Sequence, residues 1–480
     1  MIDSLLIVVP LAGAALTPLW PVARTRPWLL PATALLHSVL SIWLLIAPPT
    51  VAAGSWLAFD ALSRAVLPAV SLLFLFCAIY CVYYLRLRPE RDNRTFVALL
   101  LAVLGLLSAG HMARHLGVLW IAVEAVTLAA LPLLHFNGTP RAFEATWKYL
   151  LIGGTGIALS LLGSFCLGYA SLHGGGSGDL TFAALAAQAR GLSHPWVLAA
   201  WVLLLAGYGT KMGLAPMHTW KPDAYGEAPG VVGAVLAGGV TTVAFTALLR
   251  VRQVIAAAGE SVVAERTLLV LGVFSMLVAA LFLLATRDFK RMLAYSSIEH
   301  MGILTFGAAL GAAGTWAALF HLWTNSLTKG ALFLAAGNIR RAAGARTTDE
   351  VSGMHWLTPR SALLFVCGMF AVTALPPFGP FFSELRIVHT ALATQHFVAT
   401  VLFLCCLLFA FFGLTRLVFA IIDGRPQGDA RIRGRKFPES AGLVLPPLVL
   451  LLVSLWLGVA PPAVLYDTWT AAIAQLFGTP

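Results

Sequence analysis

Charged residues are scarce in this sequence. Asp, Glu, Lys and Arg together make up 11% of its 480 residues, whereas an ordinary soluble domain carries roughly 25%. Hydrophobic residues make up 59% of the chain, and a soluble protein of this composition would expose large apolar patches and aggregate. The composition therefore excludes an ordinary water-soluble globular protein.

Metal-binding and cofactor motifs are also lacking. The sequence has six cysteines, all within apolar segments: Cys77, Cys81, Cys166, Cys367, Cys405 and Cys406. None has the spacing of a zinc or iron–sulfur site, and buried cysteine behaves as a small apolar residue. No flavin, nickel or nucleotide motif appears either. We therefore expect no cofactor and no metal in this chain, and any electron chemistry would belong to partner subunits.

Apolar runs of roughly twenty residues recur along the whole length, and each is long enough to cross a bilayer core of about 30 Å. They predict an all-α integral membrane protein of about fourteen transmembrane helices. The predicted spans are 4–22, 28–47, 61–85, 95–110, 115–135, 145–171, 194–218, 229–249, 267–286, 292–312, 315–339, 361–389, 397–422 and 441–460. We expect the first to be retained, since it lacks a basic leader. The polar interval around 340–360 is predicted to be a loop.

The placement of the basic residues predicts the orientation. Although the formal net charge is +11, the charges lie almost wholly in short loops, which does not favour nucleic-acid binding. Loops after odd-numbered spans hold twenty Lys and Arg, and these are Arg24, Arg26, Arg86, Arg88, Arg91, Arg94, Arg141, Lys221, Arg287, Lys290, Arg291, Arg340, Arg341, Arg346, Arg360, Arg425, Arg431, Arg433, Arg435 and Lys436. Loops after even-numbered spans hold five, and these are Arg114, Arg190, Arg250, Arg252 and Arg266. The positive-inside rule then predicts a multi-pass protein of the inner (plasma) membrane with both termini extracytoplasmic.

Two spans contain prolines that predict helix breaks. Pro216 follows Lys211 in the seventh span, and Pro376 and Pro377 lie within the twelfth. Proline removes a backbone donor and clashes with the preceding turn, and matching breaks in two halves are typical of transporters with inverted repeats. Lys148 and Lys329 also match, each one span before a break. We therefore expect helices 1–3 in 1–94, a first five-helix repeat in 95–250, a second in 251–422, and the last helix and tail in 423–480.

Ionisable residues within the spans are the main functional candidates, because a charge at the bilayer centre costs a few kcal/mol or more. They are Glu124, Lys148, Lys211, Glu299, His300, His321, Lys329 and Glu384. Low dielectric disfavours the charged forms of both lysine and carboxylate, and a nearby opposite charge reverses this. A Glu–Lys pair whose spacing changes can therefore capture or release a proton. Alternatively, single members of this set form structural ion pairs between helices.

Other polar residues of the spans have simpler interpretations. Arg64, Arg386 and Arg416 lie near span ends, where arginine extends its charged head to the interface or pairs with a partner subunit. His111 and His115 lie at an interface and are expected to cap helices.

Three segments resemble the signatures of a known family. They are Lys211-Met-Gly-Leu-Ala-Pro-Met-His-Thr-Trp-Lys-Pro-Asp-Ala, Asp288-Phe-Lys-Arg-Met-Leu-Ala-Tyr-Ser-Ser-Ile-Glu-His-Met-Gly302 and Phe320-His-Leu-Trp-Thr-Asn-Ser-Leu-Thr-Lys-Gly330. The resemblance is to the antiporter-like subunits of respiratory complex I, of membrane-bound nickel–iron hydrogenases and of multisubunit cation/proton antiporters. Ile298-Glu-His-Met, Phe59-Asp-Ala-Leu-Ser63 and Pro380-Phe-Phe-Ser-Glu-Leu look most like the hydrogenase-4 component F branch.

This resemblance implies two inverted five-helix repeats and a role for each buried charge. Glu124 and Lys211 resemble the coupling ion pair of the first half, Lys329 the central lysine of the second, and Glu384 its terminal acid. The supporting members would be His218, Lys148 and His321.

The sequence departs from the family pattern at two places. Relatives carry histidine or lysine in span eight, where this chain has only Ala237, Gly238, Gly239, Thr241 and Thr242. Water or the two threonines would then have to connect the halves. The usual leucine after Thr-Trp is Lys221 here, which we expect to add a charge to a cytoplasmic loop.

The leading hypothesis is a proton-translocating, redox-inert subunit of a hydrogenase- or complex I-like assembly. Its expected partners are other membrane subunits, the lipid bilayer, protons or Na⁺ and, indirectly, peripheral redox subunits. A second hypothesis is a subunit of a cation/proton antiporter without a redox partner. A third is a subunit of a proton-driven inorganic-carbon uptake complex.

Overall fold

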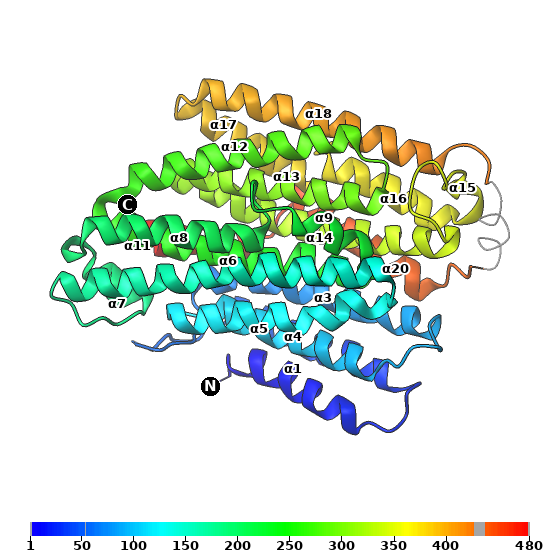
Figure 1. The fold of residues 1–480 in the computed structure, drawn as a ribbon, viewed down its shortest axis with the longest axis horizontal. Coiled ribbons are helices and arrows are strands. Elements are labelled where there is room, and N and C mark those ends of the chain that lie inside the picture. The colour runs from blue at the N-terminus through cyan, green and yellow to red at the C-terminus, as the bar shows by residue number, and fades with distance from the viewer. Residues whose placement is uncertain (1, 53, 427–436, 479–480) are drawn as a thin grey trace.

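The computed structural model describes residues 2–52, 54–426 and 437–478. Its long helices lie roughly along one common axis and form an elongated bundle (Figure 1). Within these ranges there is no β-strand, only isolated bridges. Eight helical segments there are long and apolar enough to cross a membrane. The structure thus confirms an all-α membrane protein, while the count of fourteen spans stays a prediction. Of the predicted loop cations, Arg431, Arg433, Arg435 and Lys436 lie outside the described residues.

The bundle has two distinct ends. The short helix α15 (Met354–Leu357) lies at one end, and α7 (Phe182–Ala187) lies at the other (Figure 1). The N-terminal end of α1 and the C-terminal end of the chain both lie toward α7. We call these the α15 end and the α7 end.

Side-chain caps start three of the long helices before the first break, α3 (Ala61–Arg86), α5 (Leu116–Leu134) and α6 (Pro140–His173). The other long helices there are α1 (Leu5–Leu16), α2 (Leu29–Ile46), α4 (Arg94–Met112) and α8 (His194–Met212). The Asp60 carboxylate caps α3 by accepting the Ser63 amide at 2.9 Å. Thr139 caps α6 in the same way, and Pro140 at the first helical position has no amide that needs a partner.

The helices that contain Pro216 and the Pro376–Pro377 pair are interrupted where the sequence predicts it. Helix α8 ends at Met212 because Gly213 adopts a left-handed backbone with φ of +80°, and α9 (Trp220–Glu227) begins beyond Pro216. Likewise α16 (Pro359–Val372) ends before Pro376 and Pro377, and α17 (Gly379–Ala393) begins after them.

A third irregularity, in span eight, was not expected from the sequence. Helices α10 (Gly230–Val235) and α11 (Thr241–Ile255) are joined by a π-helical turn, η5 (Leu236–Val240). A Cβ on Gly238 would lie 2.4 Å from a Leu73 methyl and 2.9 Å from the Ser326 carbonyl, so only glycine allows this approach to α14. Wide turns of this kind often mark functional segments.

The helices still to be named lie in the second half of the chain. They are α12 (Ser261–Ala285), α13 (Phe289–Ala309), α14 (Gly311–Ala343), α18 (Phe397–Ile422), α20 (Ala441–Val459) and α21 (Ala463–Phe477). Helix α14 packs against α3, α10, α13, α16, α17 and α20 and therefore forms the core of this part. The predicted loop around 340–360 begins too early, since α14 continues to Ala343 and ends where Gly344 adopts φ of +71°.

A buried cluster joins distant parts of the chain at the α7 end. The two terminal guanidinium nitrogens of Arg250, Nη1 and Nη2, donate to the Asp60 carboxylate at 2.7 and 2.9 Å. Gln475 of α21 donates to the same carboxylate at 2.8 Å and accepts the Leu62 amide. The prediction that Arg250 and Arg252 lie in a loop was wrong, because α11 extends to Ile255 and buries both side chains.

Candidate functional site

A series of buried ionisable side chains runs through the bundle interior. Its members have at most a few percent of their surface exposed, and they are Lys211, Lys221, Glu299, His300, His321, Lys329 and Glu384. Charged groups rarely lie fully buried without a partner, because removing them from water is costly. Their common location favours a functional role over packing.

The first part of this series centres on Lys211, in the last turn of α8. Its ammonium donates to the Thr127 hydroxyl at 2.5 Å and to the Tyr149 hydroxyl at 3.1 Å. The ammonium also lies 4.5 Å from the centre of the Tyr149 ring, close enough for a cation–π contact. The side chain is thus held by neutral groups of α5 and α6.

Glu124 lies one turn before Thr127 and so shares its face of α5. The charge of Glu124 acts on Lys211. However, the Lys211 ammonium and the Glu124 carboxylate, both in the described part of the chain, form no ion pair within 4.0 Å. One carboxylate oxygen of Glu124 is buried and has no hydrogen-bond partner in the described part of the chain. The structure therefore brings the two residues of the expected pair together without closing an ion pair.

Among the described residues, Lys148 and His218 form no hydrogen bond with Lys211. The Lys148 side chain is 44% exposed and pairs with Glu144 at 2.7 Å and with Asp223 at 2.8 Å. The position of Lys148 in span six had suggested a buried interior charge. This expectation was wrong, because two carboxylates hold the side chain at the bundle surface. His218 lies in the break between α8 and α9, largely buried.

Lys221 is a buried site residue that the sequence analysis missed. It lies in the first turn of α9, fully buried, and its ammonium donates to the Met212 carbonyl at 2.7 Å. The expectation of a loop charge was wrong, because the chain turns back after the break and places α9 between α6 and α13. The available signal was the apolar environment implied by Trp220 and Tyr225 on either side.

The second part of the series centres on Lys329 in α14. Its ammonium donates to the Ser296 hydroxyl at 2.5 Å, and Glu299 lies one turn further along α13. The charges of Glu299 and Glu384 both act on Lys329. Lys211 and Lys329 thus have matching surroundings, each with a short bond to a hydroxyl and a carboxylate one turn away.

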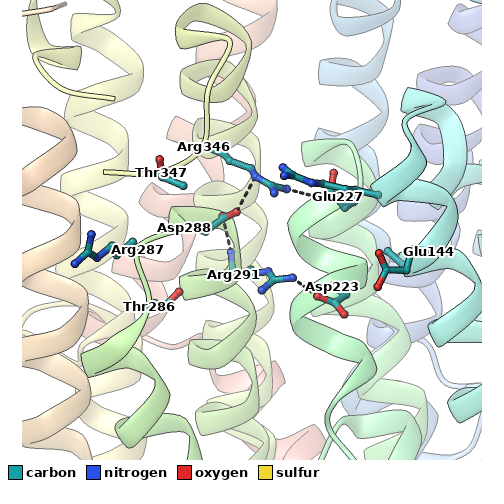
Figure 2. A pocket seen from close by; sticks show the side chains of 11 residues that line it. Glu144, Asp223, Glu227, Thr286, Arg287, Asp288, Arg291, Arg346 and Thr347 are labelled. Atoms are coloured by element: carbon teal, nitrogen blue, oxygen red, sulfur yellow. Dashed lines mark hydrogen bonds and ion pairs between the residues drawn. The ribbon is translucent and has the colours of Figure 1, made fainter. Parts of the chain in front are cut away.

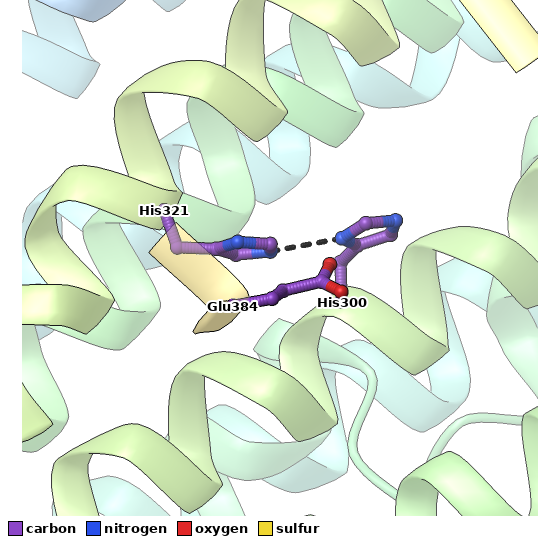
Figure 3. A group of neighbouring side chains, drawn as sticks. All are labelled: His300, His321 and Glu384. Carbon is purple, nitrogen blue, oxygen red and sulfur yellow. Dashed lines mark hydrogen bonds between the residues drawn. The ribbon is translucent and has the colours of Figure 1, made fainter. Parts of the chain in front are cut away.

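His300, His321 and Glu384 form a cluster beyond Lys329 (Figure 3). A 2.9 Å hydrogen bond joins Nδ1 of His300 to Nε2 of His321, and Nδ1 of His321 lies 2.9 Å from the Ser383 hydroxyl. Both Glu384 oxygens are buried with no hydrogen-bond partner among the described residues. One ligand atom from each of the three residues lies within 4.8 Å of the others. This donor set could hold a cation, although the direct bond between the rings already occupies the facing nitrogens, and the arrangement suits proton transfer.

A charged pocket of about 380 Å³ opens at the α15 end (Figure 2). Arg291 pairs with Asp223, and Arg346 pairs with Glu227 and lies 3.5 Å from Asp288. Arg340 reaches the same Glu227 at 3.3 Å. The sequence had identified the cations of this region as loop charges but not their acidic partners. The pairs tie α9 to α13, to α14 and to the loop that follows α14.

Comparison with known proteins gives a consistent result. A family model described as "NADH:quinone oxidoreductase/Mrp antiporter, TM" matches residues 113–410. The chain is 35% identical over 352 residues to a protein of Methylacidiphilum infernorum named hydrogenase-4 component F homolog, covering 70% of this chain and 73% of the relative.

Two further similarities extend over most of the chain. It is 33% identical over 398 residues to NADH-quinone oxidoreductase subunit N of Desulforudis audaxviator, covering 81% of this chain and 77% of that relative. A chain of the archaeal membrane-bound sulfane sulfur reductase superposes with a TM-score of 0.88 at 22% identity, over 99% of this chain and 97% of that chain. The latter similarity concerns the fold.

Proposed function

Because this chain belongs to the NADH:quinone oxidoreductase/Mrp antiporter transmembrane family, we propose that it is a proton-translocating membrane subunit of a hydrogenase- or complex I-like assembly. The observation that carries the proposal is the series of buried Lys, Glu and His side chains in and beside the two interrupted helices. Buried ionisable groups within spans commonly mark ion pathways.

The proposed pathway has two centres. In the first, Glu124 draws the positive charge of Lys211 toward it, and a change in their separation alters how firmly the lysine holds its proton. In the second, Lys329 exchanges with Glu299 or passes a proton to His300, His321 and Glu384. Lys148 is assigned to the pathway entrance, since it lies beside the charged pocket with Asp223.

The two centres correspond to the proposed inverted repeats, residues 95–250 and 251–422. In support, each repeat has one interrupted helix, α8–α9 or α16–α17, and a buried lysine bonded to a hydroxyl. The breaks bring irregular backbone into the bundle interior, which is tolerated where protein or water satisfies it. Glu384 lies just beyond the second break and would release the proton toward the α7 end.

The proposed orientation places the α15 end in the cytoplasm and both termini outside. Its support is the excess of Lys and Arg in loops at that end. Reporter fusions after Arg346 and after Phe477 should give cytoplasmic and external signals respectively. The opposite signal at either site would overturn the arrangement of about fourteen spans.

Electron transfer would take place in partner subunits. The relatives are named as components of hydrogenase-4 and of NADH-quinone oxidoreductase, and both names favour a redox-driven assembly. The family description also includes Mrp antiporters, so a cation/proton antiporter subunit is the second candidate.

Purification of the native complex through a tag on this chain separates the two. Mass spectrometry should find peripheral redox subunits, and vesicles containing the complex and a pH-sensitive dye should take up protons when the electron donor is supplied. A purified complex of membrane subunits alone that exchanges Na⁺ for protons would favour the antiporter.

A further inference from the structure

The pathway as described has a gap between its two centres. Lys211 contacts α5 and α6, whereas Lys329 contacts α13. Residues 230–249 of span eight contain no ionisable side chain. The Thr242 hydroxyl donates to the Gly239 carbonyl at 2.6 Å and lies 3.2 Å from a His111 nitrogen, so it serves α4 and its own helix.

Lys221 occupies this gap, and we propose that it is the proton-carrying residue that connects the two centres. The inference rests on the proposed function. It assigns to α9 the connection that span eight cannot provide in this chain.

The location of Lys221 is the first argument. Helix α9 packs against α6 of the first repeat and α13 of the second. At its start, Lys221 donates to the carbonyl of Met212, the neighbour of Lys211. On the other side, α9 packs against α13, whose Ser296 binds Lys329, and the Tyr225 ring lies 5.5 Å from the ring of Phe333, one turn along α14 from Lys329. The charges of Lys221 and Lys329 act on each other.

The absence of a counter-charge is the second argument. No carboxylate lies within 4.0 Å of the Lys221 ammonium among the described residues, whereas Lys148 has two and Arg291 has one. One carbonyl satisfies one of its three N–H donors. A buried lysine in this condition is poised to give up its proton when Lys329 becomes charged, because two neighbouring positive charges repel each other.

Space for the side chain is the third argument. A Cβ on Gly213 would lie 2.6 Å from Cδ and 3.1 Å from Nζ of Lys221, so the glycine leaves a passage for it. The ring of Tyr225 lies 5.5 Å from the ammonium. The rings of Trp220 and Tyr149 are 5.0 Å apart, and the Tyr149 hydroxyl accepts a hydrogen bond from Lys211.

A structural alternative is that Lys221 only caps α8. A positive charge at a helix C-terminus is favourable, and Trp220 also donates to a carbonyl of that last turn, that of Thr210. Arginine at 221 would preserve such a cap, but it cannot release its proton in a protein. The two roles therefore predict different results for Lys221→Arg.

The test uses the purified native complex in vesicles, with proton uptake measured per electron-donor turnover. We expect Lys221→Leu to assemble, because an apolar side chain suits a fully buried position beside Trp220 and Tyr225, and to lose uptake. Lys221→Arg should lose it too, whereas Lys221→His should keep a part.

The outcomes separate this inference from the proposed function. Parent-like uptake in Lys221→Leu or Lys221→Arg, together with loss in Lys329→Met, would overturn the role of Lys221 alone. If Lys221→Leu failed to assemble, the Lys221→Arg result would decide. Full uptake in both Lys211→Met and Lys329→Met would overturn the proposed function itself.

Discussion

The interior series and the pocket at the α15 end are built from similar side chains in opposite arrangements. In the pocket, Asp223 and Glu227 each bind at least one cation directly. In the interior, Glu124, Glu299 and Glu384 each leave at least one oxygen without a hydrogen-bond partner in the described chain.

This difference indicates what each set does. A closed ion pair favours one charge state of both partners, so its protons stay in place. A carboxylate near a lysine but not bonded to it can change state when the distance changes. On the proposed pathway, the closed pairs near the α15 end would give structural support, and the carboxylates of the interior would take part in proton movement.

The largest effect on proton uptake is expected from Lys329, which lies among the unpaired carboxylates of the described interior. Lys329→Met should lower proton uptake by roughly 100-fold or more, the range lost with a general acid–base group, because its charge interacts with both Glu299 and Glu384. Uptake is measured with a pH-sensitive dye in vesicles of the purified complex. Lys329→Arg is the control for charge without proton release, and normal uptake in that variant would show that charge alone is sufficient.

Glu384 is expected to rank second. Glu384→Gln should lower uptake roughly tenfold or more, whereas Glu384→Asp keeps a titratable group and should retain part of the activity. The same dye assay compares the two variants. If the Gln variant took up protons as well as the parent, proton exit would lie in a partner subunit.

Glu124→Gln should have a smaller effect than Lys329→Met, a drop of about severalfold. Lys211 keeps its bonds to Thr127 and Tyr149 in this variant and loses only the charge that acts on it. Uptake per turnover and subunit content are measured together. Loss of assembly with normal uptake in the residual complex would make Glu124 a structural residue.

The ion pairs of the pocket at the α15 end should have the smallest effect on proton uptake. Arg291→Ala removes a pair whose arginine is 46% exposed, and exposed pairs contribute about 0.5 kcal/mol. We therefore expect near-parent uptake and a small decrease in the thermal unfolding temperature of the complex. A loss as large as that of Lys329→Met would remove the distinction between the two sets.

The sequence was sufficient for the features that depend on local chemistry. Pro216, Pro376 and Pro377 predict helix breaks because proline removes a backbone donor and clashes with the preceding turn, and both breaks are present. Proline alone does not decide this, since α3, α5 and α20 continue through Pro68, Pro132 and Pro446. Lys211 and Lys329 stand out because charges are rare in apolar spans. Their immediate partners, Thr127 and Ser296, could not be predicted, since hydroxyl groups on other helices are common and only packing selects one.

Features that depend on tertiary contact were missed. Lys221 stands in a polar stretch that resembles a loop, and only the return of the chain after Gly213 buries it. Arg250 was placed outside its helix because hydropathy falls near its end, yet its carboxylate partner, Asp60, lies far away in the sequence. The π-helical turn in span eight follows from close contact with α14, which the order of residues does not reveal.

The cluster of Asp60, Arg250 and Gln475 has a consequence for biosynthesis. Asp60 is synthesised early together with Ser63, but its partners Arg250 and Gln475 follow 190 and 415 residues later. The contact among Asp60, Arg250 and Gln475 therefore cannot be completed until α21 has been synthesised and has packed against α3. Until then the carboxylate at the start of α3 has only the neighbouring Ser63 as a partner, so the α7 end is completed only after nearly the whole described chain has been made.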